Sequence, residues 1–149
     1  MTNPNRTSDT TLAGKCFCGA VHDALADEFV YAANRHLSNG RRATGAAFKP
    51  FAGIKRAQLA VTAGADNLLV FGDENGSDTH CRVCGSLLYS LVRAGAFVHV
   101  AMGTLVDAPS IRPNQHIFVG SKAPWFTICR RPAPIPGAWG GRRIGQWLG

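Results

Sequence analysis

Four of the five cysteines in the chain stand in two close pairs, and a glycine follows each pair. The first pair is Cys16 and Cys18, and the second is Cys81 and Cys84. Thiolates are soft ligands that suit zinc, and four of them complete the tetrahedral shell of a structural zinc site. The glycines permit a tight turn after each pair, so that backbone amides can point at the sulfur atoms. The sequence therefore predicts one zinc ion that joins the start of the chain to its middle.

Two other uses of these cysteines compete with the zinc site. They could form disulfides, but a bridge within the first pair would be strained, because a single residue separates its two cysteines. They could also be small apolar residues of the core. The spacing favours the single zinc site over both. Cys129 stands far from the other cysteines in the sequence, which favours a buried or idle thiol over a reactive one.

Composition limits the class of protein. The chain has 149 residues, about the length of one domain, and 46% of them are hydrophobic, so a core can form. The net charge of +7 favours anionic partners. The basic residues form no stripe interleaved with aromatic residues, so nucleic-acid binding is not expected. No apolar stretch approaches the roughly 20 residues that span a bilayer, and the start of the chain lacks a secretory signal. We therefore expect a cytoplasmic protein whose cysteines stay reduced.

The elements that must position the cysteines are short strands. Apolar runs between turn signals predict a mainly β domain at residues 14–129, after a flexible polar arm at 1–13 and before a tail rich in proline, glycine and arginine at 130–149. The tail is either disordered or packed through its tryptophans, and the sequence leaves both open. One short helix is expected at 38–45. The expected strands are 19–24, 28–33, 46–52, 59–63, 67–71, 86–92, 96–102, 115–120 and 125–129.

Four segments, in order along the chain, resemble the motifs of the glutathione-dependent formaldehyde-activating enzyme (GFA) and centromere protein V-like family. They are residues 14–21, 41–48, 80–89 and 102–125. The resemblance implies a β-tent (Mss4-like) fold of short antiparallel strands pinned by a structural zinc, with few short helices. It also implies carbon–sulfur lyase chemistry on S-hydroxymethylglutathione, the adduct of glutathione and formaldehyde.

The resemblance also assigns metal ligands. The family's structural zinc is held by the first and third motifs, which here carry the two cysteine pairs. A second zinc of the family is bound by the cysteines of a Cys-His-Cys-x-x-Cys stretch. This chain keeps the histidine as His36 but has Arg35, Leu37 and Gly40 at the three cysteine positions. None of these three can ligate zinc as a thiolate does, so the expectation is one zinc per chain and no metal-assisted lyase step.

Without the second metal, acceleration could come only from positioning and from acid–base groups. His36 is a candidate general base, and the alternative is a surface histidine. Arg35, Arg41 and Arg42 could hold the carboxylates of glutathione, and the alternative is a solvated basic face. Phe48 could line the same pocket or belong to the core.

The remaining candidates have structural interpretations. His99 lies in a strand and is expected to be hydrogen-bonded or exposed, and His80 either supports the zinc site or is an exposed turn residue. His116 is expected to fix the loop 107–113 by a hydrogen bond, and Trp125 is expected to anchor the core. Each of these interpretations can be checked against the fold.

Two functions follow as hypotheses. The first is a GFA-family protein with the structural zinc and an altered reaction centre for the glutathione–formaldehyde adduct. The alternative is a non-enzymatic binding module that uses the basic region 35–42 for a thiol peptide such as glutathione, an anionic small molecule or a protein partner. A redox role for Cys129 is disfavoured, because the sequence offers no resolving cysteine.

Overall fold

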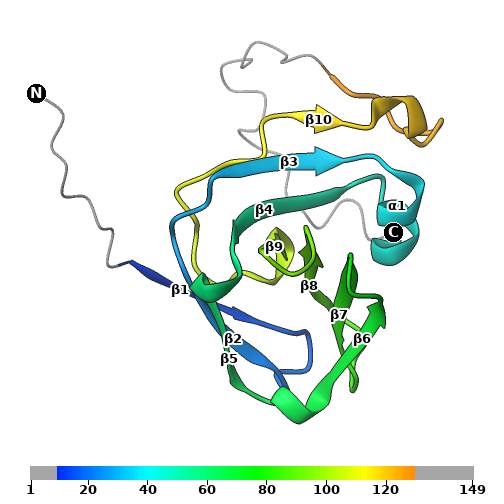
Figure 1. The fold of residues 1–149 in the computed structure, drawn as a ribbon. Helices are drawn as coiled ribbons and strands as arrows, with labels where there is room; N and C mark the ends of the chain where they lie inside the picture. The colour runs from blue at the N-terminus through cyan, green and yellow to red at the C-terminus, as the bar shows by residue number, and fades with distance from the viewer. Residues whose placement is uncertain (1–9, 130–149) are drawn as a thin grey trace, which may run out of the picture.

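The computed structural model describes residues 10–129, which form ten β-strands, one α-helix and four short 3-10 helices (Figure 1). The strands make two sheets. The smaller has three strands in the order β1-β2-β5, and the larger has seven in the order β10-β3-β4-β9-β8-β7-β6. Strand β10 pairs with β3 in parallel, and the other pairs are antiparallel. The predicted mainly β fold of short antiparallel strands with few helices is confirmed.

The bounds of the elements are as follows. The strands are β1 (Thr11–Lys15), β2 (His22–Ala26), β3 (Tyr31–Arg35), β4 (Lys49–Lys55), β5 (Leu59–Ala63), β6 (Leu68–Gly72), β7 (Ser77–Cys81), β8 (Leu87–Val92), β9 (Phe97–Ala101) and β10 (His116–Ile117). The helices are α1 (Ser38–Thr44), η1 (Arg56–Gln58), η2 (Ala65–Asn67), η3 (Met102–Thr104) and η4 (Val119–Ser121). No helix within residues 10–129 is long and apolar enough to cross a membrane.

Two strands are absent from the sequence-based prediction. Residues 11–13, assigned to the polar arm, belong to β1, whose inward positions are Leu12 and a glycine. Strand β7 turns Thr79 and Cys81 inward and is otherwise polar. Neither strand has the run of large apolar residues that marks a strand in a sequence. Both form because a neighbouring strand completes their hydrogen bonds, β2 for β1 and both β6 and β8 for β7.

The end of the described chain also differs from the prediction. Residues 125–129 form no strand, and no strand of the described chain pairs with them. Trp125 is 71% exposed and so does not anchor the core, whereas Ala123 nearby is fully buried. The predicted helix at 38–45 is confirmed as α1. Residues 1–9 of the predicted arm and the predicted tail at 130–149 lie outside the described residues.

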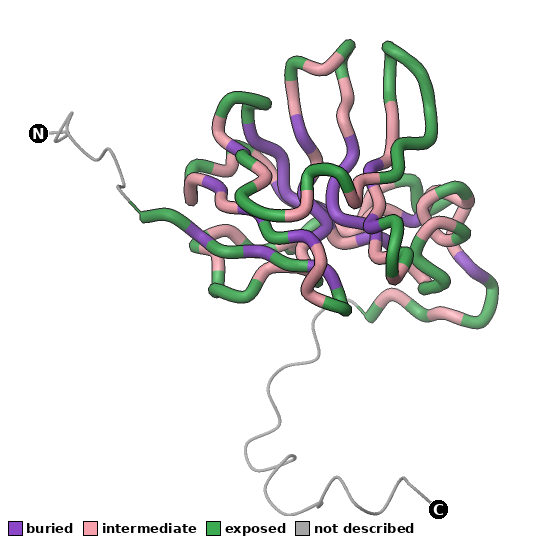
Figure 2. Tube along the Cα trace, turned by 90° about the horizontal axis from the view of Figure 1, so that it is seen from below, coloured by how far each residue is buried: buried purple, intermediate pink, exposed green. Residues whose placement is uncertain are grey.

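The core joins the two sheets. Side chains alternate between the faces of a strand, so every second residue of the larger sheet turns toward the smaller one. The buried segments gather in the interior of the molecule (Figure 2), and the core cluster takes residues from strands of both sheets. The core cluster contains Leu12, Cys16, Val21, Leu25, Ile54, Leu59, Cys81, Leu88, Tyr89, Val98 and Val100.

Because side chains alternate, the remaining residues of the larger sheet lie on its opposite face. Tyr31 of β3, Phe51 of β4 and His99 of β9 lie together on that face. The ring centroids of Phe51 and His99 are 4.3 Å apart, and those of Tyr31 and His99 are 5.4 Å apart. We call this side, opposite to the core cluster, the outer face. It is the part of the sheet that is available for a binding site.

Candidate functional site

The two cysteine pairs come together in space although they are far apart in the sequence. All four Sγ atoms lie within 4.8 Å of one another. The Sγ atoms of Cys16 and Cys18 are 3.6 Å apart, and those of Cys18 and Cys81 are 3.9 Å apart. These distances exceed the roughly 2.05 Å of a disulfide. Four thiolates around one zinc at about 2.3 Å would be about 3.8 Å apart, so the cluster fits a tetrahedral metal centre.

The turns after the cysteine pairs have the backbone that their glycines permit. Gly19 and Gly85 both have φ of 81°, in the left-handed region. The Val21 amide donates to the Sγ of Cys16 at 3.3 Å, as the sequence analysis predicts for these turns. His80 Nδ1 donates to the carbonyl of Gly85 at 3.2 Å. His80 therefore supports the turn of the second pair and is not an exposed turn residue.

A serine that the sequence analysis does not consider links the two turns. The hydroxyl of Ser86 lies 3.2 Å from the Sγ of Cys84 and accepts a hydrogen bond from the Phe17 amide at 3.0 Å. Hydrogen bonds from the hydroxyl and the backbone amide of Ser86 lower the pKa of Cys84 to about 5. This lowering of its pKa favours the thiolate form of Cys84, which is the form that binds metal.

The three positions that the resemblance assigns to a second metal site lie at the junction of β3 and α1. Arg35 ends β3, Leu37 precedes α1, and Gly40 lies in the first turn of that helix. A Cβ atom at Gly40 would lie 3.5 Å from the Cβ of Lys49, and Lys49 is the cross-strand partner of Arg35. The fold thus brings two of the three positions, Arg35 and Gly40, near Lys49, and none of the three carries a thiol.

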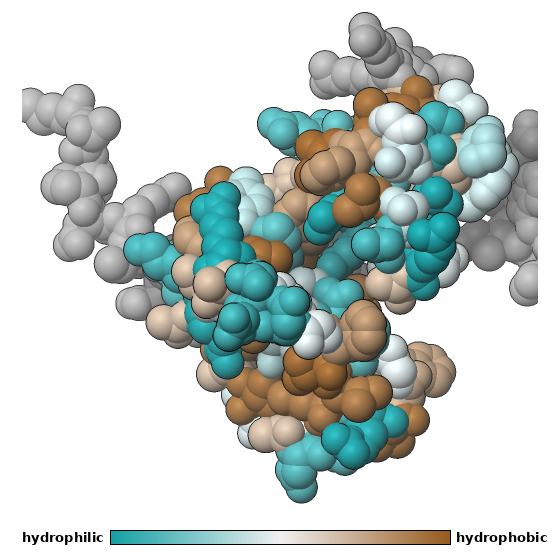
Figure 3. Space-filling view, turned by 45° about the vertical axis from the view of Figure 1, so that its right-hand side comes forward, coloured by the Kyte–Doolittle hydropathy of each residue, from teal (hydrophilic) through white to brown (hydrophobic). Residues whose placement is uncertain are grey.

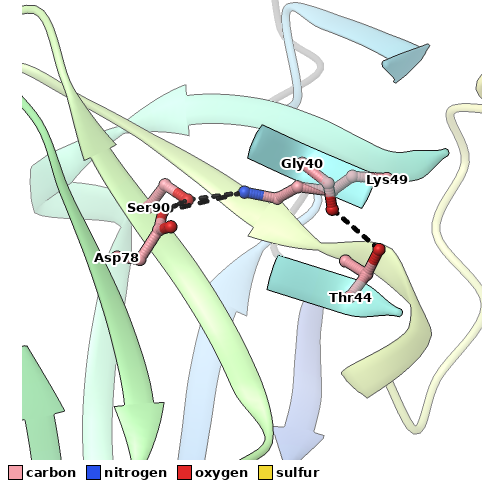
Figure 4. A network of polar contacts seen from close by, with 5 residues as sticks. All are labelled: Gly40, Thr44, Lys49, Asp78 and Ser90. Atoms are coloured by element: carbon pink, nitrogen blue, oxygen red, sulfur yellow. Dashed lines mark hydrogen bonds and ion pairs between the residues drawn. The ribbon is translucent and has the colours of Figure 1, made fainter. Parts of the chain in front are cut away.

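Lys49 is a charged residue that sequence reasoning missed. Its side chain is 5% exposed and crosses the outer face to Ser90, with 2.6 Å between Nζ and the serine Oγ (Figure 4). Ser90 in turn donates to the carboxylate of Asp78, which lies 4.0 Å from the Lys49 Nζ. Burial lowers the pKa of Lys49, and the positive charge of Arg35 adds to the effect, while Asp78 opposes it.

These charges bear on metal binding at the β3–α1 junction. Arg35 carries a fixed positive charge, and Lys49 adds a second cation beside it. Asp78 forms the one ion pair found among the described residues. A zinc ion placed beside the arginine would meet like charge and no thiolate, which disfavours it. An anion placed there would be attracted.

His36 is fully buried, so the surface alternative for this residue is wrong. Its Nε2 lies 2.7 Å from the Nδ1 of His116, and the rings of Phe48 and Phe126 pack against it. Burial lowers the pKa of His36, and the nearby His116, Lys122 and Arg41 lower it further. His36 is therefore neutral at pH 7, with its Nε2 engaged by a second histidine.

The partner of His116 differs from the expected one. His116 bonds His36 and not the loop 107–113. That loop is held instead by Asn34, whose side-chain amide donates to the carbonyl of Pro113 at 2.9 Å, and by Asp107, which accepts from the backbone of β1 at 2.7 Å.

The three predicted substrate-binding residues lie in different surroundings. Phe48 is half-buried in the ring cluster of His36. Arg42 is exposed on α1, and the buried Nε of Arg41 has no hydrogen-bond partner among the described residues. Arg35 alone of the predicted arginines lines the hollows of the outer face. The structure thus separates Arg35 from the other two arginines.

Comparison with known proteins decides the family. The sequence profile of the glutathione-dependent formaldehyde-activating enzymes matches residues 11–121. The chain belongs to this family. The GFA fold is also found in the crystal structure of a Rhodobacter sphaeroides protein, with a TM-score of 0.54 and 26% sequence identity over 70% of this chain and 98% of that one. A search of curated proteins finds no match. The resemblance drawn from the four motifs is confirmed.

The surface around the GFA domain is mixed in character. Apolar groups form separate areas on the face shown in Figure 3, with hydrophilic side chains between them. Six of the ten exposed large apolar residues found in the described chain lie on the edge strand β6 and on the segment after β10. They are Leu69, Val70 and Phe71 on the first, and Phe118, Val119 and Trp125 on the second.

The metal cluster generates a prediction about stability. Cys81→Ser should lower the free energy of unfolding by at least about 3 kcal/mol, and the melting temperature by roughly 10 °C, because metal binding and folding are coupled. Cys129→Ser is the matched control, since Cys129 is an exposed free thiol outside the cluster. Thermal and urea unfolding would measure both. An unchanged melting temperature for Cys81→Ser would remove the structural role of the cluster.

The buried histidine generates a prediction about pH. The folded pKa of His36 is lowered below 6.5, so below that pH the unfolded chain binds more protons. The free energy of unfolding should therefore fall as the pH drops from 6.5 toward 5, and be independent of this group above 6.5. His36→Gln should make the fall shallower, measured by urea unfolding at several pH values. The control is the same substitution at the exposed His22, His22→Gln. Equal slopes of the unfolding free energy against pH for wild type and His36→Gln would contradict the account.

Proposed function

We propose that the protein is a single-zinc GFA-family member that binds glutathione and its formaldehyde adduct and lacks the family's metal-assisted lyase step. The proposal rests on the replacement of the three cysteines of the second metal site by Arg35, Leu37 and Gly40. The first site is complete, and a set of four thiolates is typical of closed, structural zinc. Such an ion contributes folding free energy and offers no open position to a substrate.

The residues at the β3–α1 junction favour binding over turnover. Arg35 can form a two-pronged hydrogen bond with a carboxylate of glutathione. Lys49 adds positive charge, but its Nζ is engaged by Ser90 and is buried. His36 is engaged by His116. A group that is to take a proton must reach the reacting atom, so neither residue is well placed as a free base.

The first test counts metal and follows the reaction. Elemental analysis of the purified protein should give about one zinc per chain. Exchange NMR of glutathione and formaldehyde mixed with the protein should show saturable binding. The exchange rate should stay within about tenfold of the uncatalysed rate, because positioning of the reactants is the only source of acceleration left without a second metal. Two zinc ions per chain, a much faster exchange, or no binding of either glutathione or the adduct would overturn the proposal.

A gain-of-site experiment tests the assignment of the second metal position. Changing Arg35, Leu37 and Gly40 together to cysteine should raise the zinc content from about one to about two per chain, because thiolates would replace the missing ligands. The space is available, since a Cβ at Gly40 makes only ordinary contacts. The matched control replaces the same three residues by serine, which should leave the zinc content unchanged. Equal zinc in the two triple variants would show that these positions are not a degraded metal site.

A further inference from the structure

A cavity of about 520 Å³ opens on the outer face of the larger sheet, beside Arg35. Its wall is mainly apolar, with Ala33, Phe51 and Val92 among its residues. The polar groups in the wall are few and include two arginines and a tyrosine–histidine pair. We propose that this cavity binds a small aromatic carboxylate, with the ring in the apolar part and the carboxylate between the side chains of Arg35 and Arg93.

Within residues 10–129 the two arginines have no acidic partner. No carboxylate of these residues lines the cavity, and the ion pair found among them joins Lys49 to Asp78 and involves neither arginine. The Nε of Arg35 is buried and has no hydrogen-bond partner in the described part of the chain. A buried donor without a partner is costly, so a bound anion would relieve that cost as well as pair the charge.

The arginines are instead held over aromatic rings. The guanidinium carbon of Arg35 lies 5.1 Å from the ring centroid of Phe118, and that of Arg93 lies 4.8 Å from Phe97 and 5.8 Å from Tyr31. Such stacking fixes the guanidinium plane and leaves its N–H edges free to bind a carboxylate. The contacts therefore orient both cations without neutralising them.

Tyr31 and His99 form the second polar feature of the cavity. The tyrosine hydroxyl lies 2.6 Å from the Nε2 of His99. Burial and the positive charges of Lys49, Arg35 and Arg93 lower the pKa of His99 to about 4, so the imidazole is neutral at pH 7. The pair thus offers hydrogen bonds without a further charge. Of the two alternatives expected for His99, hydrogen-bonded or exposed, the structure shows the first, with a partner on β3.

The cavity also depends on an absent side chain. Tyr31 faces Gly53 across the β3–β4 pair. A Cβ atom at Gly53 would lie 2.3 Å from the Cζ atom of the Tyr31 ring, so any larger residue there would displace the ring. The glycine therefore allows the tyrosine to lie flat against β4 and to form part of the wall.

Backbone strain is concentrated at the same place. Three non-glycine residues of the described chain have positive φ, and two of them, Arg93 at 52° and Phe118 at 56°, line the cavity. The third, Ala94 at 54°, follows Arg93 in the β8–β9 turn, where asparagine and glycine are the usual residues. A left-handed backbone is unfavourable for residues with a Cβ atom, and strain of this kind clusters at ligand sites.

The chemistry of the wall selects the class of ligand. Glutathione is a polar peptide, and most of this wall could not satisfy its amides and ammonium group. An aromatic ring would stack on Phe51 and Phe118, and a carboxylate matches the geometry of a guanidinium. The inference concerns a ligand distinct from glutathione. The two ligands share Arg35 and would compete for it, but the cavity and Arg93 carry this inference whether or not glutathione binds.

The test is a titration of the zinc-loaded protein with 1-naphthoate. Binding is measured by calorimetry and by NMR of the tyrosine and histidine rings. The neutral amide, 1-naphthamide, is the matched ligand and should bind at least about tenfold more weakly, because it lacks the charge. The resonances of Tyr31 and His99 should shift with 1-naphthoate. Glutathione, formaldehyde and metal counting play no part, so the outcome is separate from that of the proposed function.

Two arginine variants locate the site. Arg93→Gln should weaken 1-naphthoate binding about fivefold or more, and Arg93→Lys should weaken it less, because the charge remains. Arg112→Gln, at an exposed arginine outside the cavity, should change the affinity less than about twofold. Equal affinity for the acid and the amide, an unaffected Arg93→Gln, or shifts confined to other residues would each overturn the proposal.

Discussion

The fold depends on the meeting of four sulfur atoms that come from two distant turns. Cys16 and Cys81 are almost completely buried and belong to the core cluster, so the sulfurs are part of the packing between the sheets. Thiolates held this close repel one another unless a cation lies among them. The turns that carry the cysteines hold the sulfur atoms close together. Each turn has a left-handed glycine, and the Ser86 hydroxyl contacts both turns. A bound metal would therefore couple the small sheet to the large one.

The two faces of the larger sheet differ in their residues: one face forms the core, and the other carries the polar and charged groups. The inner face packs on the small sheet and holds the apolar core. The outer face carries a buried lysine, a tyrosine–histidine pair and arginines that pair with no carboxylate of residues 10–129. At the junction of β3 and α1 the described side chains include two cations, Arg35 and Lys49, and no thiol, so this position favours an anion over a metal ion.

Local features of the sequence predicted the parts of the structure that depend on local geometry. The spacing of the cysteines and the glycines after them predicted the cluster and its turns, and the helix at 38–45 follows from a short local pattern. Strands β1 and β7 could not be found in this way, because they lack a run of large apolar residues and form through hydrogen bonds to the neighbouring strands. The same holds for burial: Lys49 and His36 are covered by several elements, and Trp125 is left exposed because no element packs on it. The cavity was missed because strands β3, β4 and β9 contribute to it together.

X-ray absorption at the zinc edge, measured on the purified protein, tests the central claim most directly. The account predicts a single shell of four sulfur atoms at about 2.3 Å and no nitrogen or oxygen ligand. A mixed shell containing nitrogen or oxygen, or the absence of bound zinc in a protein that remains folded, would contradict it.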